Sequence, residues 1–186
     1  MINNLAIVIP SYNENESINE LYLKLETILK KVNIEDYEII YIDNGSTDKS
    51  LDILKKIHST NKRVKIISFS RNFGQENAIM AGIQYCKKDN LFIINGDLQD
   101  PPEILEEFIV KASEGYDVVY GIKKYREASF IMKFFYKLFY FIYSKSSEIQ
   151  MPKQSGNVCL INKKVIKTIK SFKENILFLI GLRTWV

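Results

Sequence analysis

The stretch LFIINGDLQDPPE, from Leu91 to Glu103, decides the fold. Its first four residues are apolar, as in a strand that is buried on both faces of a sheet. The loop after them carries oxygen ligands at Asn95, Asp97, Gln99 and Asp100. Pro101 and Pro102 end the strand pattern, and proline is well placed in the first turn of a helix. The pattern predicts a ligand-bearing carboxyl edge of a parallel sheet. The alternative is a polar turn that caps the next helix, with Asp100 as N-cap.

The same alternation of strand and helix runs through most of the chain. Apolar runs predict strands over residues 5–9, 37–42, 64–69, 91–94, 117–120 and 154–161. Apolar residues on one side predict helices over residues 18–29, 51–57, 76–85, 104–112 and 163–171. Pro10 closes the first apolar run. Such alternation predicts an α/β fold, with an open, mostly parallel Rossmann-like sheet and helices on both faces.

Composition and length limit the function classes. The 186 residues are enough for one domain, and no apolar run reaches the ~18–20 residues that span a bilayer. Cys86 and Cys159 lie far apart without metal spacing, so we expect reduced thiols in the cytosol. The net charge is +4, and no basic stripe continues through the sheet region, so we expect no nucleic-acid binding.

The loops that follow the predicted strands at 5–9, 37–42 and 91–94 carry acids or amides and should meet at one edge of the sheet. Tyr12 could stack on a base, or it could be a packing aromatic. Asp43 could accept from a base N–H or a ribose hydroxyl, or it could cap a helix. Arg71 could bind a phosphate as a bidentate donor. No Gly-x-Gly-x-x-Gly or Gly-Lys-Ser/Thr pattern is present, so the sequence supports neither a dinucleotide fingerprint nor a phosphate loop.

Four motifs in order carry a family resemblance: PSYNE at 10–14, DNGSTD at 43–48, SRNFG at 70–74 and GDLQDPPE at 96–103. Together they resemble the family 2 glycosyltransferases. The last two are most similar to the polyprenyl-phosphate branch, which includes dolichol-phosphate mannose synthase and the bactoprenol glucosyltransferases. The resemblance implies a GT-A fold. It also implies inverting transfer of a sugar from a UDP- or GDP-sugar to undecaprenyl or dolichyl phosphate at the cytoplasmic membrane face.

The resemblance also implies site residues. The expected nucleotide-sugar-binding residues are Pro10, Tyr12, Glu14, Asp43, Asn44, Arg71, Asn95 and Asp97. Mg²⁺ or Mn²⁺ is expected on Asp97, Gln99 and Asn95, with Asp97 as the catalytic residue. Two positions depart from the family pattern. Asn44 stands where a second aspartate is common, and Asn95 stands where the metal motif usually begins with aspartate. An amide oxygen can still be a ligand, but it brings no charge and should weaken metal binding.

The segment 128–144 carries many phenylalanines and tyrosines with a narrow polar stripe that includes lysines. Such a helix suits a membrane interface, although it could instead dock on the sheet or form a dimer contact, so a homo-oligomer stays possible. Lys124, Arg126 and Ser129 are the expected ligands of the acceptor phosphate. We therefore divide the single expected domain into a nucleotide-sugar-binding half, 1–122, and an acceptor and membrane half, 123–186.

The last part of the chain departs from the family more than the first. GNVCL at 156–160 stands where the family often has Gly-Asp-Phe-Arg-Leu, so Asn157 and Cys159 replace an acid and a base. GLRTW at 181–185 resembles a family motif after which further catalytic-domain residues are expected, so the C-terminal part is expected to be missing. Two alternatives stay open: a family 2 enzyme with a saccharide acceptor, and a degenerate nucleotide-sugar-binding module without catalysis.

Overall fold

The computed structural model describes residues 2–122 and 155–172. The strands are β1 (Asn4–Ser11), β2 (Asp36–Asp43), β3 (Val64–Ser68), β4 (Asn90–Ile93), β5 (Val118–Ile122) and β6 (Ser155–Asn162). The helices are α1 (Ile18–Lys31), α2 (Ser50–Thr60), α3 (Gln75–Tyr85), α4 (Ile104–Ser113) and α6 (Lys163–Ser171). Every strand and helix that the sequence predicted in these ranges is present, with bounds shifted by up to three residues.

The strands form one sheet in the order β3-β2-β1-β4-β6-β5. Pairing is parallel from β3 through β2 and β1 to β4, and β6 is antiparallel to both of its neighbours. The predicted α/β fold with a mostly parallel sheet is therefore confirmed. The position of β6, between β4 and β5, was not predicted. It brings a segment of the expected acceptor half into the same sheet as the nucleotide-binding half.

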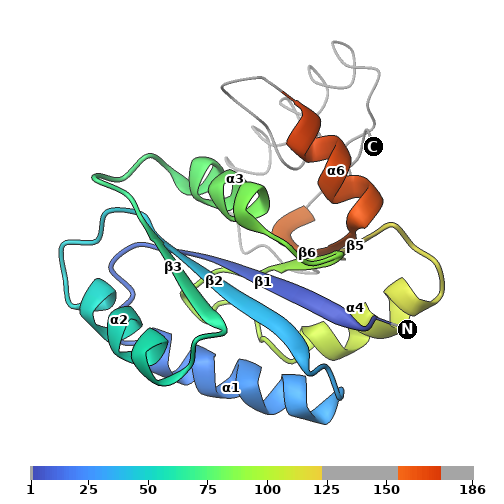
Figure 1. The fold of residues 1–186 in the computed structure, drawn as a ribbon, viewed down its shortest axis with the longest axis horizontal. Coiled ribbons are helices and arrows are strands. Elements are labelled where there is room, and N and C mark those ends of the chain that lie inside the picture. Colours follow the sequence, from blue (N-terminus) through green and yellow to red (C-terminus); the bar gives the residue numbers. More distant parts are fainter. Residues whose placement is uncertain (1, 123–154, 173–186) are drawn as a thin grey trace, which may run out of the picture.

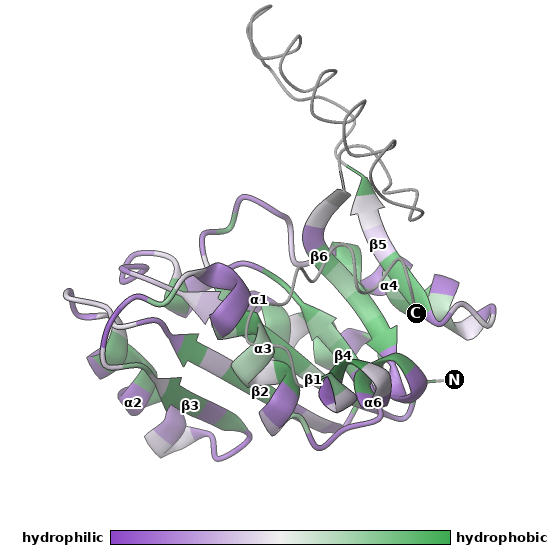
Figure 2. Ribbon diagram, turned by 90° about the horizontal axis from the view of Figure 1, so that it is seen from above, coloured by the Kyte–Doolittle hydropathy of each residue, from purple (hydrophilic) through white to green (hydrophobic). Residues whose placement is uncertain are grey.

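Helices cover both faces of the sheet, with α1, α2 and α4 below it and α3 and α6 above it in Figure 1. Successive side chains of β1 point to opposite faces of the sheet. Ile7 and Ile9 pack on the side of α1, α2 and α4, and Ala6 and Val8 pack on the side of α3 and α6. This double coverage explains why the run at 5–9 is apolar without interruption. In Figure 2 the central strands are largely hydrophobic, whereas the loops beyond the carboxyl ends of β1, β2 and β3 are mostly hydrophilic.

Strand β1 continues through Pro10 to Ser11, although the sequence placed its end at the proline. Proline lacks an N–H, but its carbonyl remains an acceptor. The Pro10 carbonyl accepts from the Gly96 N–H at 3.3 Å, and the Ser11 carbonyl accepts from the Asn44 N–H at 2.8 Å. The end of β1 is thus held between the loops that follow β2 and β4, which brings those loops together.

Helix α4 begins at Ile104, two residues after the proline pair that was expected to open it. The Pro101 and Pro102 carbonyls accept from the Ile104 and Leu105 N–H groups in a turn that precedes the helix. The residue at the N-cap position is Glu103, without a side-chain capping bond. The capping alternative for Asp100 is therefore wrong, and the polar loop 95–100 ends before the helix starts.

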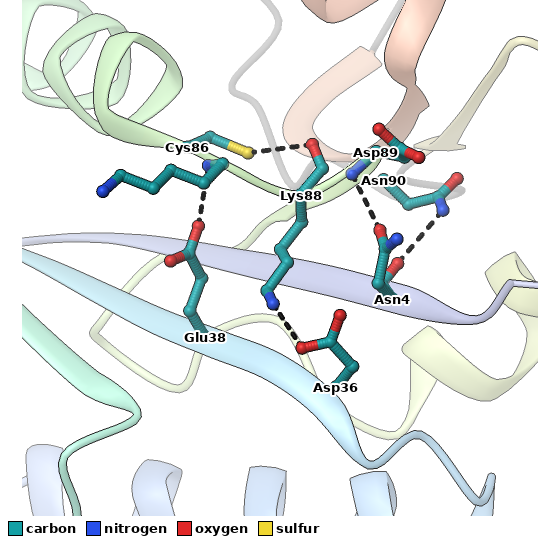
Figure 3. A network of polar contacts seen from close by, with 8 residues as sticks. Asn4, Asp36, Glu38, Cys86, Lys88, Asp89 and Asn90 are labelled. Carbon is teal, nitrogen blue, oxygen red and sulfur yellow. Dashed lines mark hydrogen bonds and ion pairs between the residues drawn. The ribbon is translucent and has the colours of Figure 1, made fainter.

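The amino ends of the strands are closed by hydrogen bonds to the connection between α3 and β4 (Figure 3). The Lys87 backbone N–H donates to the Glu38 carboxylate at 2.9 Å. The Lys88 ammonium pairs with the Asp36 carboxylate. Further bonds in this network join Asn4, Cys86, Lys88, Asp89 and Asn90. At this end of the sheet the polar groups therefore bond mainly to one another.

Cys86 and Cys159 are both buried, and no disulfide joins them. Cys159 lies in β6 and packs in the core layer of α3 and α6, so its side chain fills the core. Within the two described ranges, the structure contains no helix with the length and apolarity needed to cross a membrane. The predictions for Lys124, Arg126, Ser129, the segment 128–144 and the motif 181–185 lie outside the described residues.

Candidate functional site

A cleft of about 400 Å³ lies at the carboxyl ends of β1 and β4. Six of its lining residues belong to the expected nucleotide-sugar-binding set: Pro10, Tyr12, Glu14, Asn44, Asn95 and Asp97. The cleft thus joins loops that are far apart in the sequence, as expected for strands that end at one edge. The other lining residues are Ser11, Asn72, Gly74, Gln75 and Gly96, of which all but Gln75 lie within the four motifs although none was expected to bind the ligand.

Tyr12 lines the cleft and is 41% exposed. The loop that carries it is fixed by the DNGSTD motif of the neighbouring strand. The Asn13 N–H donates to the Ser46 hydroxyl at 3.0 Å, and the Asn13 side-chain oxygen accepts from the Thr47 N–H at 2.8 Å. Asn13 adopts φ 57°, a left-handed conformation that asparagine tolerates better than most residues. The motif therefore holds the tyrosine loop in place.

Asp43 lies beside the cleft but does not line it. Its side chain is 1% exposed, and its two carboxylate oxygens accept from the Ser46 N–H at 3.2 Å and the Ser68 hydroxyl at 2.8 Å. These bonds connect the ends of β2 and β3. The structure thus gives Asp43 a role in loop fixation, and its binding to a nucleoside stays a prediction.

Arg71 also lies outside the cleft lining. Its guanidinium stacks on the Phe73 ring, 4.6 Å from the centroid, and its backbone packs directly against Gly45. An exposed guanidinium held by one aromatic ring can still turn toward a phosphate. Phosphate binding by Arg71 therefore stays a prediction.

Glu14 and Asp97 bring two carboxylates into the cleft from different loops. The Ser17 hydroxyl donates to the Gly96 carbonyl at 2.6 Å and lies 3.2 Å from a Glu14 carboxylate oxygen, so it ties the two loops together. Burial raises the pKa of the Glu14 carboxyl above its ordinary 4.5, and repulsion by Asp97 and Asp48 adds to this, while the Ser17 hydrogen bond opposes it. The cleft is therefore a site that disfavours further negative charge unless a cation accompanies it.

We expect Glu14→Gln to be more heat-stable than the wild type at neutral pH. Because the pKa of Glu14 is raised in the folded state, its ionisation lowers the stability of the fold as the pH rises from 4.5 to that raised pKa, and the loss is absent below pH 4.5. The glutamine keeps an acceptor for Ser17 but removes the charge. The advantage should therefore shrink as the pH falls to 4.5 and below. Thermal denaturation across pH measures it, with Glu16→Gln as the charge-matched control at an exposed position. Equal curves for the two variants would contradict the interpretation.

The metal motif has one carboxylate that faces the cleft. One Asp97 carboxylate oxygen accepts from the Gln99 N–H at 3.1 Å, which leaves the second oxygen for a ligand. The Asn95 side-chain oxygen accepts from the Gln75 amide at 2.6 Å, and the Asn95 amide nitrogen lies 3.5 Å from an Asp100 oxygen. The Gln99 side chain is exposed and does not line the cleft. Metal binding by Gln99 and Asn95 stays a prediction.

These residues fit a divalent cation that is shared with a diphosphate. Across 2–122 and 155–172, no group of three or more acidic, histidine or cysteine side chains could enclose a metal. Mg²⁺ is commonly held by one or two carboxylates, substrate phosphate oxygens and water rather than by a protein cage. An oxygen-only loop with Asp97 at its centre, facing Glu14, meets that description. Asp97 is the residue that would hold the cation, and the cation would offset the charge of the diphosphate.

The model of glycosyl transferase family 2 matches residues 6–170 of this sequence. The chain belongs to glycosyltransferase family 2. This membership accounts for the order of the four motifs and for their meeting at one cleft. The domain is therefore that of a family of sugar-transferring enzymes.

Relatives in two bacteria share most of this family 2 domain. The chain is 39% identical to an uncharacterized glycosyltransferase of Synechocystis sp. over 183 residues, which cover 98% of this chain and 57% of the relative. It is 40% identical to the uncharacterized glycosyltransferase YkcC of Bacillus subtilis, with 97% and 56% covered, and 34% identical to the putative glycosyltransferase CsbB of the same organism, with 98% and 55% covered. The chain thus spans somewhat more than half the length of these relatives.

Two solved structures share the fold at low sequence identity. One is the mannosyltransferase PcManGT from Pyrobaculum calidifontis in complex with GDP-Man and Mn²⁺, with a TM-score of 0.64, 18% identity, and 98% of this chain and 50% of that chain covered. Another is glucosyl-3-phosphoglycerate synthase from Mycobacterium tuberculosis in complex with UDP, with a TM-score of 0.57, 16% identity, and 88% and 58% covered. The expected GT-A type of fold is confirmed.

Proposed function

We propose that this family 2 domain transfers a sugar from a nucleoside diphosphate sugar to a polyprenyl phosphate and inverts the anomeric centre. The observation that carries the proposal is one cleft at the carboxyl edge of the sheet, with Tyr12, Glu14 and Asp97 from two separate loops on its walls. An aromatic ring, an oxygen ligand and a rim of polar amides suit a base, a metal-bound diphosphate and a sugar.

The donor would lie across the cleft with its base at Tyr12 and its diphosphate at Asp97. The ring of Tyr12 is exposed enough to stack on a base, and Asp97 has a carboxylate oxygen free of the Gln99 bond. Asp43 and Arg71 complete the proposed donor site from just outside the lining. GDP-Man with Mn²⁺ and UDP are ligands of the two similar structures, which is why we propose a UDP- or GDP-sugar with Mg²⁺ or Mn²⁺ here.

The proposal of a polyprenyl phosphate as acceptor rests on the sequence of residues 123–186. A phosphate monoester has a second pKa of about 6, so it is already a nucleophile near neutral pH and needs no strong general base. The cleft contains no histidine, and the single histidine, His58, bonds to the Val64 carbonyl in another part of the molecule. Lys124, Arg126 and Ser129 are the proposed ligands of the acceptor phosphate. The segment 128–144 is the proposed contact with the cytoplasmic face of the membrane.

A donor and acceptor panel tests this function. Calorimetric titration with UDP- and GDP-sugars, with and without Mn²⁺, should give metal-dependent binding of one nucleotide class. Sugar transfer should then occur to undecaprenyl or dolichyl phosphate and not to free saccharides. Transfer to a saccharide alone would select the enzyme with a saccharide acceptor. Binding without transfer to any acceptor would select a non-catalytic module, and no binding of any donor would overturn the proposal.

A further inference from the structure

Asn44 lies in the cleft wall, where the loops that follow three strands meet. It is 4% exposed, and its backbone N–H donates to the Ser11 carbonyl at 2.8 Å. Its side-chain oxygen accepts from the Phe73 N–H at 2.9 Å, and its side-chain nitrogen donates to the Asn72 oxygen at 3.1 Å. Asn44 thus joins the ends of β1 and β2 to the loop before α3, through its backbone N–H on one side and its side-chain amide on the other.

Asn72 completes the connection from the other side. Its side-chain oxygen accepts from the Gly74 N–H at 2.8 Å as well as from Asn44. The two backbone donors, at Phe73 and Gly74, fix which end of each side-chain amide is oxygen. The residues held in this way, Asn72 and Gly74, line the cleft together with Gln75, the first residue of α3.

We propose that Asn44 and Asn72 form a positioning pair that sets the α3 side of the donor site, and that this pair requires an amide at position 44. The inference rests on the proposed function and deepens it. The amide nitrogen of Asn44 is a donor that a carboxylate lacks. The neutral residue that stands where an aspartate is common therefore has a defined partner, the Asn72 oxygen.

Two isosteric substitutions separate this pair from a general effect of charge. N44D keeps an acceptor for Phe73 but places a carboxylate oxygen against the Asn72 oxygen. Rotation of the Asn72 amide would relieve that contact only by giving up the Gly74 bond. N72D keeps the acceptor that both of its donors need. Each substitution adds one negative charge to the same wall, so repulsion of a diphosphate is common to both.

The experiment is titration of UDP and GDP, with Mn²⁺, into the wild type, N44D and N72D. For the nucleotide that the wild type binds, we expect the Kd to rise about tenfold more in N44D than in N72D, the effect of one lost buried hydrogen bond. The affinity of N44D should recover relative to the wild type at acid pH, because a protonated carboxyl donates again. A purely structural role would lower the melting temperature without this pH profile.

Amide hydrogen exchange gives a readout that needs no nucleotide. Exchange at Phe73 and Gly74 should be faster in N44D and unchanged in N72D. Equal weakening of nucleotide binding by the two substitutions, or no change in exchange in N44D, would overturn the positioning pair. If the wild type binds neither nucleotide, the proposed function fails. The exchange rates then show separately whether the pair holds the loop.

Discussion

Asp97→Asn should lower the kcat/KM of sugar transfer by about a thousandfold, because it removes the carboxylate that would hold the metal on the donor diphosphate. A metal supplies several kcal/mol of charge stabilisation in such a displacement, and each ~1.4 kcal/mol is a factor of ten. Asn95 beside it is already neutral, so the substituted loop would offer only amide oxygens at these two positions. Asparagine keeps an acceptor for the Gln99 N–H, so the loop itself should persist.

The measurement is steady-state transfer to a polyprenyl phosphate together with calorimetric binding of the nucleotide with and without Mn²⁺. Asp97→Asn should remove the difference that Mn²⁺ makes to nucleotide affinity. Asp100→Asn is the matched control, since it makes the same change of charge three residues along the loop, outside the cleft lining. Undiminished transfer by Asp97→Asn would exclude Asp97 from the mechanism, and equal losses in both variants would point to loop charge in general.

Gly45→Ala should destabilise the protein by about 3 kcal/mol, from backbone strain of ~1–2 kcal/mol and steric overlap of ~1–3 kcal/mol. Gly45 adopts φ +73°, in the left-handed region. An added Cβ would lie 2.5 Å from the Arg71 carbonyl carbon and 2.6 Å from its Cα. Both are backbone atoms, so relief requires the loop 70–74 to move away from the end of β2. The same movement would disturb the cleft wall and weaken nucleotide binding.

Urea denaturation measures the loss, and Gly115→Ala separates its two components. Gly115 adopts φ +101°, but a Cβ there would meet nothing within 4 Å, so its substitution carries strain without overlap. Gly121 is not among the glycines with positive φ, and the nearest atom to an added Cβ there lies at 3.7 Å. Gly121→Ala should therefore leave the free energy of unfolding nearly unchanged. We expect Gly45→Ala to cost clearly more than Gly115→Ala. Equal costs would show that the close approach to Arg71 does not limit this turn.

The fold was predictable because its pattern is local. Apolar runs at 5–9 and 91–94 indicated strands that are buried on both faces, and both are central strands of the sheet. Parallel strands present their following loops at one edge, so the sequence alone was enough to expect Tyr12 and Asp97 in one cleft. The antiparallel insertion of β6 between β4 and β5 could not be expected, because no local signal in 154–161 states which strand it pairs with.

The contacts of Asp43 and Asn44 could not be predicted from their motif. Both belong to the DNGSTD motif, and both were expected to bind the nucleotide. In the structure the Asp43 carboxylate accepts a hydrogen bond from Ser68 of β3. The Asn44 side chain forms hydrogen bonds with Asn72 and Phe73. Those partners lie 25 to 29 positions further along the chain, so the motif alone does not contain them. The only hint of these contacts in the sequence is the asparagine at position 44, because an amide can donate a hydrogen bond and a carboxylate cannot.

The sequence by itself determined the α/β class, the order of strands and helices, the family and the edge at which polar loops gather, since each follows from residue pattern over short range. Only the tertiary structure decided which of those polar groups face the cleft and which bond to one another. The reason is physical: a buried carboxylate or amide must find partners, and in this fold the nearest partners come from neighbouring strands that the chain reaches only after a helix.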